Sequence, residues 1–133
     1  MKKIISILIC AFILMSATAF SASSDNGVYE YEIDGTEYTV RFADSNVPAE
    51  KQELIARKLV GIDDESVQSR GLGCILFGHD YVYTSTSVVT HKVRSSSPRC
   101  RRDNYDITYC EDCDDYYEET LTSSTYIVCC PVE

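Results

Sequence analysis

The chain has 133 residues, with 21 acidic and 12 basic side chains, so its formal net charge at neutral pH is −9. This length suits a single domain of modest size. A charge this negative argues against nucleic acid and anionic membrane surfaces as partners. The ten tyrosines, in the absence of tryptophan, suit half-buried strand faces.

The first nineteen residues have the organisation of a signal peptide. Lys2 and Lys3 precede an apolar run over residues 4–15, and an Ala-Thr-Ala sequence ends at Ala19. The run is too short for a helix that crosses a hydrocarbon core of ~30 Å, which takes about 20 residues. We therefore expect removal of residues 1–19 on export, a disordered leader over 20–27, and a secreted protein without a transmembrane segment. Loss of the two lysines would take the net charge from −9 to −11.

Residues 28–70 predict a β-hairpin followed by a helix. The extended runs 28–33 and 36–42 are joined by Asp34-Gly35, a pair that supplies the positive φ angles of a type I′ turn. Alternating apolar residues give each run one face to bury. A helix is expected to start at Asn46 or Val47, with Pro48 in its first turn, and to end at Gly61. The polar stretch 63–70 reads as a connector.

Residues 71–133 contain six of the seven cysteines and both histidines. Runs rich in β-branched and aromatic residues predict strands over 81–94, 105–110 and 121–129. Pro98 falls in a loop between the first two runs. We expect an α+β fold in which the N-terminal hairpin and one helix pack, as one domain, beside a cysteine-rich antiparallel sheet of three strands.

Two chemistries compete for these cysteines. An even number in a small exported domain is typical of a disulfide framework, in which each bridge contributes about 2–4 kcal/mol. Alternatively, Cys74-x4-His79 and Cys110-x2-Cys113 are closely spaced pairs that could supply four ligands to a tetrahedral zinc ion. On these residues the stretch 71–115 resembles a zinc ribbon in which a Cys-x4-His pair replaces one of two Cys-x2-Cys pairs. The resemblance implies a structural zinc.

The rest of the inventory allows a second set, made of His91, Cys100, Cys129 and Cys130. Neighbouring residues in a strand point to opposite faces. Cys129 and Cys130 could therefore reach one ion only if the chain turns before Pro131. A mixed arrangement avoids this requirement, with zinc at the first set and a disulfide from Cys100 to Cys129 or Cys130. His91 alone is typical of a buried strand histidine.

The C-terminal half also resembles a family of small exported bacterial proteins to which no activity is assigned. The matching segments are Cys74–His79, Thr90–Val93, Pro98–Cys100, Cys110–Cys113 and Cys129–Pro131. This resemblance implies export but no catalytic or binding role.

Charge is distributed unevenly along the same half. A basic cluster precedes an acidic run over residues 111–119, and consists of Lys92, Arg94, Arg99, Arg101 and Arg102. Two solvated loops are the favoured interpretation. The alternative is that the basic cluster contacts an anionic polymer at the cell surface.

No catalytic constellation stands out. Carboxylates surround Cys110 and Cys113, and they are expected to raise the thiol pKa and to disfavour redox catalysis. Four protein ligands would also leave a zinc ion no open position for substrate. We therefore expect a secreted, non-enzymatic interaction module whose partner is an extracellular protein or a cell-surface polymer. A secreted zinc- or thiol-dependent enzyme, or a toxin or inhibitor, is the alternative.

Overall fold

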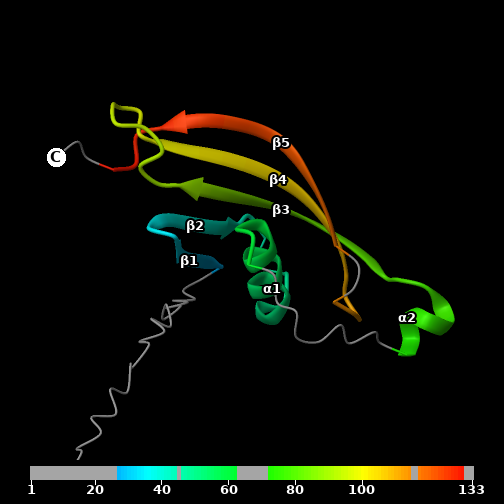
Figure 1. The fold of residues 1–133 in the computed structure, drawn as a ribbon. Coiled ribbons are helices and arrows are strands. Elements are labelled where there is room, and N and C mark those ends of the chain that lie inside the picture. The colour runs from blue at the N-terminus through cyan, green and yellow to red at the C-terminus, as the bar shows by residue number, and fades with distance from the viewer. Residues whose placement is uncertain (1–26, 45, 63–71, 115–116, 131–133) are drawn as a thin grey trace, which may run out of the picture.

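The computed structural model describes residues 27–44, 46–62, 72–114 and 117–130. Its main element is one antiparallel sheet in which the strands follow each other in chain order, from β1 to β5 (Figure 1). The strands are β1 (Val28–Ile33), β2 (Thr36–Phe42), β3 (Tyr81–Thr90), β4 (Cys100–Cys110) and β5 (Tyr117–Ile127), and the helices are α1 (Ala49–Leu59) and α2 (Leu72–Phe77). The expected signal peptide, most of the leader and the connector 63–70 lie outside the described residues.

The expected α+β fold with a separate three-stranded sheet is wrong, because the hairpin and the C-terminal strands form one sheet of five strands. β2 pairs with β3 from Tyr38 opposite Thr90 to Phe42 opposite Thr86. A free β2 edge would present unpaired N–H and C=O groups, and β3 satisfies them. The fold is therefore mainly β, with two short helices.

The hairpin prediction is confirmed. Asp34 and Gly35 have φ angles of 51° and 76°, which the type I′ turn requires, and Ile33 lies opposite Thr36. The helix differs at its start, because Pro48 precedes α1 as its N-cap. Its end agrees with the prediction, since Gly61 adopts a φ of 81° and its N–H donates to the carbonyl of Lys58 at 3.1 Å.

The predicted strands of the C-terminal half have different bounds in the structure. β3 ends at Thr90, two residues before Lys92 takes a left-handed φ of 53°. β4 and β5 each have 11 residues and begin earlier than expected. The apolar patch within 71–80, for which no element was predicted, contains the short helix α2.

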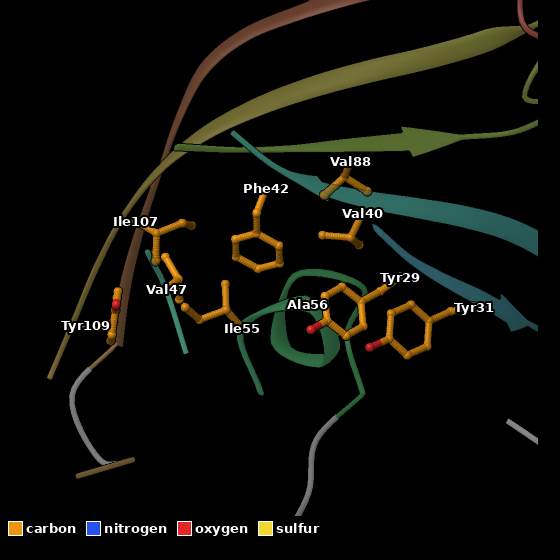
Figure 2. Close-up of a cluster of buried hydrophobic side chains, with 10 residues drawn as sticks. All are labelled: Tyr29, Tyr31, Val40, Phe42, Val47, Ile55, Ala56, Val88, Ile107 and Tyr109. Atoms are coloured by element: carbon orange, nitrogen blue, oxygen red, sulfur yellow. The ribbon is translucent and has the colours of Figure 1, made fainter. Parts of the chain in front are cut away.

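The hydrophobic core lies between α1 and one face of the sheet (Figure 2). Ile55 and Ala56 of α1 are fully buried against strand residues such as Val40 and Ile107. Strand side chains alternate between faces. The opposite face therefore carries residues such as Arg41, which is exposed.

The long strands place the two ends of β3 and β4 far apart. Tyr81 lies opposite Cys110 at one end, and Thr90 lies opposite Arg101 near the other. At about 3.3 Å per residue, the ten residues of β3 span roughly 30 Å. Among the described residues, no helix has the length and apolar character needed to cross a membrane.

Candidate metal centres

Both Cys/His sets found in the sequence come together in space. Within each set, the candidate ligand atoms all lie within 4.8 Å of one another. We name them site 1, which consists of Cys74, His79, Cys110 and Cys113, and site 2, which consists of His91, Cys100, Cys129 and Cys130. Each group could hold a metal ion. That an ion binds there stays a prediction.

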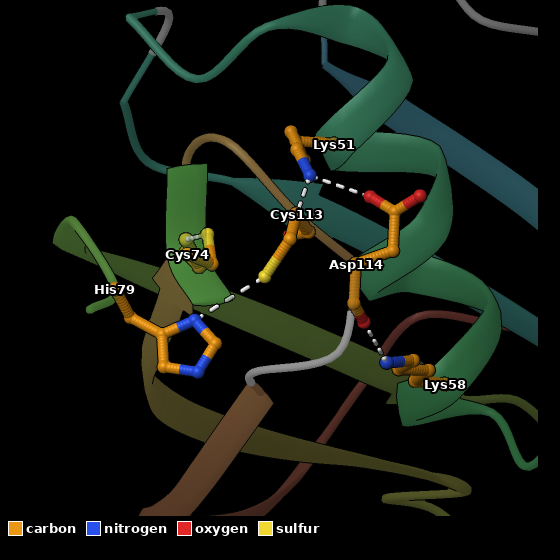
Figure 3. A network of polar contacts seen from close by, with 7 residues as sticks. Lys51, Lys58, Cys74, His79, Cys113 and Asp114 are labelled. Carbon is orange, nitrogen blue, oxygen red and sulfur yellow. Dashed lines mark hydrogen bonds and ion pairs between the residues drawn. The ribbon is translucent and has the colours of Figure 1, made fainter. Parts of the chain in front are cut away.

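Site 1 is assembled from α2 and from the turn that follows β4. Cys74 lies in α2. Gly78, with a φ of 85°, turns the chain so that the His79 ring faces Cys113 (Figure 3). The N–H of Gly78 donates to the carbonyl of Cys74 at 3.1 Å. Cys110 is the last residue of β4, and its Sγ lies 3.4 Å from that of Cys74. The Sγ of Cys113 lies 3.3 Å from Nδ1 of His79.

Two lysines of α1 hold the turn that carries Cys113. Lys51 Nζ donates to the carbonyl of Cys113 at 2.9 Å and pairs with the Asp114 carboxylate at 2.5 Å. Lys58 Nζ donates to the carbonyl of Asp114 at 3.2 Å (Figure 3). Site 1 is thereby anchored to the hydrophobic core. The sequence contained no signal for these contacts, because more than fifty residues separate the partners.

The thiols of site 1 have opposite pKa shifts. Burial opposes ionisation of Cys110, but hydrogen bonds from His79, the backbone of Asp112 and the thiols of Cys74 and Cys113 together lower its pKa from 9.0 to about 6. Burial and hydrogen bonds with Cys110 and Cys113 raise the pKa of Cys74 to about 12. The expectation that neighbouring carboxylates raise the thiol pKa is therefore wrong for Cys110. One thiolate is already favoured here, and thiolate is the form that binds metal.

Site 2 is assembled where β3, β4 and β5 end. β5 stops at Ile127, so Cys129 and Cys130 lie beyond the strand. Their sulfurs lie 3.4 Å apart. Because the two residues are outside the strand, their side chains do not point to opposite faces, and both sulfurs can reach the same ion. Cys100, the first residue of β4, lies opposite Ile127 in register. His91 directly follows β3.

The separations in site 2 fit both metal and disulfide chemistry. Nδ1 of His91 lies 3.2, 3.4 and 3.8 Å from the sulfurs of Cys129, Cys130 and Cys100, and the sulfurs of Cys100 and Cys130 are 3.5 Å apart. A tetrahedral zinc with Zn–S of about 2.3 Å and Zn–N of about 2.0 Å separates its ligands by roughly 3.5–3.8 Å. The exception is the pair Cys100 and Cys129, whose sulfurs form a disulfide. This bond is the disulfide part of the mixed arrangement, and zinc at site 1 stays a prediction.

Thr39 of β2 is a functional candidate that the sequence did not reveal. Its Oγ1 lies 2.8 Å from Nε2 of His91. When Nε2 carries the proton and donates to this oxygen, the Nδ1 lone pair faces the sulfurs, as is usual for metal-binding histidines. His91 is thus half-buried at a strand end, with both ring nitrogens engaged. Thr39 reaches it only because β2 pairs with β3.

The basic cluster lies at the site 2 end, but its members have different surroundings. The Arg94 guanidinium stacks 3.6 Å from the ring centre of Tyr126. Arg101 pairs with the buried Asp103 at 2.9 Å. Arg102, the next residue along β4, faces the opposite side of the sheet. Contact with an anionic polymer stays a prediction.

The fold and the two sites define a mainly β chain with two preformed Cys/His clusters. No known protein family, curated protein or solved structure matches this chain. The likeness to a zinc ribbon therefore rests on the clusters alone.

Proposed function

We propose that this chain is an exported, non-enzymatic interaction module whose sheet is held together by structural zinc at site 1. At site 2, either all four side chains bind a second zinc ion or two of them form the Cys100–Cys129 disulfide. The observation that carries the proposal is the convergence, at opposite ends of one sheet, of two sets of three sulfurs and one imidazole nitrogen.

The donor set supports zinc rather than a harder cation. Thiolate and imidazole ligands suit zinc, whereas calcium and magnesium prefer oxygen. Four protein ligands complete a tetrahedron, so such an ion has no free position at which to activate water. A structural site is therefore favoured over a catalytic one.

The shape of the sheet supports a need for such cross-links. β5 is an edge strand, exposed over nearly its whole length, and β3 to β5 extend beyond the helix-covered core. Site 1 would join α2 to the end of β4. Site 2 would join the ends of three strands. Tying distant segments together in the folded state offsets the limited burial of apolar surface.

The experiment is metal analysis, combined with counting of free thiols, on the purified protein. Two bound zinc ions and no disulfide would establish metal at both sites. One zinc with the Cys100–Cys129 bond would establish the mixed form. Protein that folds without metal and without free thiols would contradict the zinc proposal. Export is tested separately, because cleavage after Ala19 would leave Phe20 as the new N-terminus.

The enzyme and polymer alternatives have their own tests. A zinc-directed inhibitor that binds the loaded protein without removing the ion would indicate an open coordination position and an enzyme. Neutralising Arg99, Arg101 and Arg102 should reduce retention at the cell wall if the basic cluster binds an anionic polymer. Unchanged retention would exclude an anionic cell-surface polymer as the partner of the basic cluster.

A further inference from the structure

The second half of α2 forms an exposed apolar tip. Ile75, Leu76 and Phe77 are 63, 72 and 90% exposed. Isolated exposed apolar residues are common, but three large ones in succession mark an interaction surface. Figure 1 shows α2 at one extremity of the molecule, away from α1. Cys74 of site 1 and the turn at Gly78 fix its orientation.

Acidic side chains lie at the same end of the sheet as this tip. Asp80, Glu111 and Asp112 are all exposed at the same end of the sheet, and the N–H of Glu111 donates to the carbonyl of Asp80 at 3.1 Å. The turns of α2 contain no basic residue. This charge disfavours an anionic bilayer and favours a partner surface that is apolar and positive.

The same chain carries a surface of that kind. An open groove of about 410 Å³ crosses the sheet face opposite α1. Val28, Val89 and Ile127 contribute apolar surface to it, and Arg41 and Arg102 contribute two positive charges. A single carboxylate, that of Glu30, lines the groove beside them. The groove thus complements the tip in both polarity and charge.

The tip and the groove of one molecule cannot meet. Tyr81, at the site 1 end of β3, is eight residues from Val89, which lies opposite Arg102 in the groove. Eight residues of strand span about 26 Å. We propose that the Ile75–Phe77 tip of one copy docks into the groove of a second copy. This names a partner for the proposed interaction module and rests on site 1 holding α2 in place.

The expected contact is weak and directional. A three-residue tip in a shallow groove buries less surface than a stable interface does, so a dissociation constant of roughly 10–100 µM is expected. Because tip and groove are different surfaces, repeated docking produces either open chains or a pair that docks reciprocally.

Sedimentation equilibrium tests this on protein expressed from the full chain, purified in the form that the host releases. Leu76→Ser combined with Phe77→Ser removes the tip, and Arg41→Glu combined with Arg102→Glu reverses the groove charge. Each variant alone is expected to associate at least about tenfold more weakly than the parent. Leu121→Ser is the matched control, because Leu121 is 54% exposed on β5 and lies outside tip and groove.

Mixing the two variants is the decisive step, because the intact tip of one and the intact groove of the other should restore association. A mixture that stays monomeric would overturn the proposal, as would a parent that is monomeric up to about 1 mM or a tip variant that associates like the parent. A monomeric parent that binds phosphatidylcholine vesicles through the tip would assign it to a bilayer instead. Metal content is measured on every sample, so that a failure of docking is distinguished from a failure of the proposed zinc site. If the double variant of the tip loses metal, Phe77→Ser alone replaces it.

Discussion

Sites 1 and 2 use the same donor set, but the protein encloses them differently. In site 1, Cys110 and Cys113 are buried and two helix lysines hold the turn between β4 and β5. In site 2, Cys129 is exposed and borders the open groove. Identical ligands can therefore serve a closed, core-anchored cross-link at one end and an accessible one at the other.

The sulfur–sulfur contacts of the two sites differ as well. The Cys100–Cys129 bond lies in site 2, whereas the sulfurs of Cys74 and Cys110 in site 1 remain 3.4 Å apart. An exposed sulfur can be reached by oxidants and chelators. In reduced protein loaded with zinc at both sites, we expect site 1 to retain its ion and site 2 to exchange its ion.

The largest expected effect comes from dismantling site 1. Replacing both Cys110 and Cys113 with serine should remove one equivalent of zinc and destabilise the fold by roughly 3–5 kcal/mol, because the end of β4 loses its link to α2. Thermal melting of the metal-loaded variant and parent measures this. Cys129→Ser, which removes an exposed ligand, is the control with a smaller expected effect. Equal melting temperatures for the parent and the double variant would show that the cross-link at site 1 does not stabilise the fold.

Chelator competition sharpens the comparison between sites. In fully reduced, zinc-loaded protein, the zinc of site 2 should transfer to a chromogenic chelator at least about tenfold faster than the zinc of site 1. The reason is that Cys129 is exposed, so the chelator can reach the ion there. The Cys129→Ser variant should lose the fast phase and keep the slow one. Two equivalents released at the same rate would show that enclosure does not distinguish the sites.

Thr39→Val tests whether the contact with Thr39 orients the His91 ring at site 2. Loss of the hydroxyl removes the hydrogen bond to Nε2 of His91, and such changes typically cost 10–100-fold in metal affinity. Isotope-edited NMR of the imidazole nitrogens reports the tautomer directly. Thr39→Ser should restore both affinity and tautomer. A valine variant with parental affinity would mean that the contact does not orient the ring.

Lys51→Met is the corresponding test of site 1. It removes the bonds to the Cys113 carbonyl and to Asp114, with an expected destabilisation of about 1–2 kcal/mol, since Lys51 is only 14% exposed. The slow phase of zinc release should become faster. Glu53→Gln, at an exposed position of the same helix, is the control. An unchanged rate of zinc release would show that the contacts of Lys51 do not contribute to metal retention.

A pH dependence of stability is expected in metal-free, reduced protein. The folded-state pKa of Cys110 is lowered to about 6, so its stabilising contribution is complete above 9.0 and disappears as the pH falls through 6. The pKa of Cys74 is raised to about 12, so its contribution is complete below 9.0 and is lost as the pH rises toward 12. Denaturant unfolding at several pH values should therefore show greatest stability near pH 9. The serine variant of both Cys110 and Cys113 should lack the acidic part of this dependence.

Local features were predictable because short-range geometry controls them. Asp34-Gly35 specified its turn and Gly61 its helix end, since both positions need φ angles that few residues adopt. Spacing also identified the candidate ligands, because Cys-x2-Cys and Cys-x4-His pairs converge within a single turn. The strand bounds were less accurate. β-branched composition continues beyond the end of β3, whereas the polar start of β4, Cys100–Asn104, is extended because it pairs with β3 and β5 on either side.

The sequence by itself determined the hairpin and the end of α1 through contacts between near neighbours, and it identified the candidate ligands, whose convergence joins residues more than thirty positions apart. Only the tertiary structure decided that β2 joins β3, that Thr39 reaches His91, and that Lys51 holds the Cys113 turn. Backbone hydrogen bonds can form between any two open strand edges. The residues that pair therefore do not specify the order of the strands in the sheet. The partners of Thr39 and Lys51 are 52 and 62 residues away, and only the completed sheet brings them together.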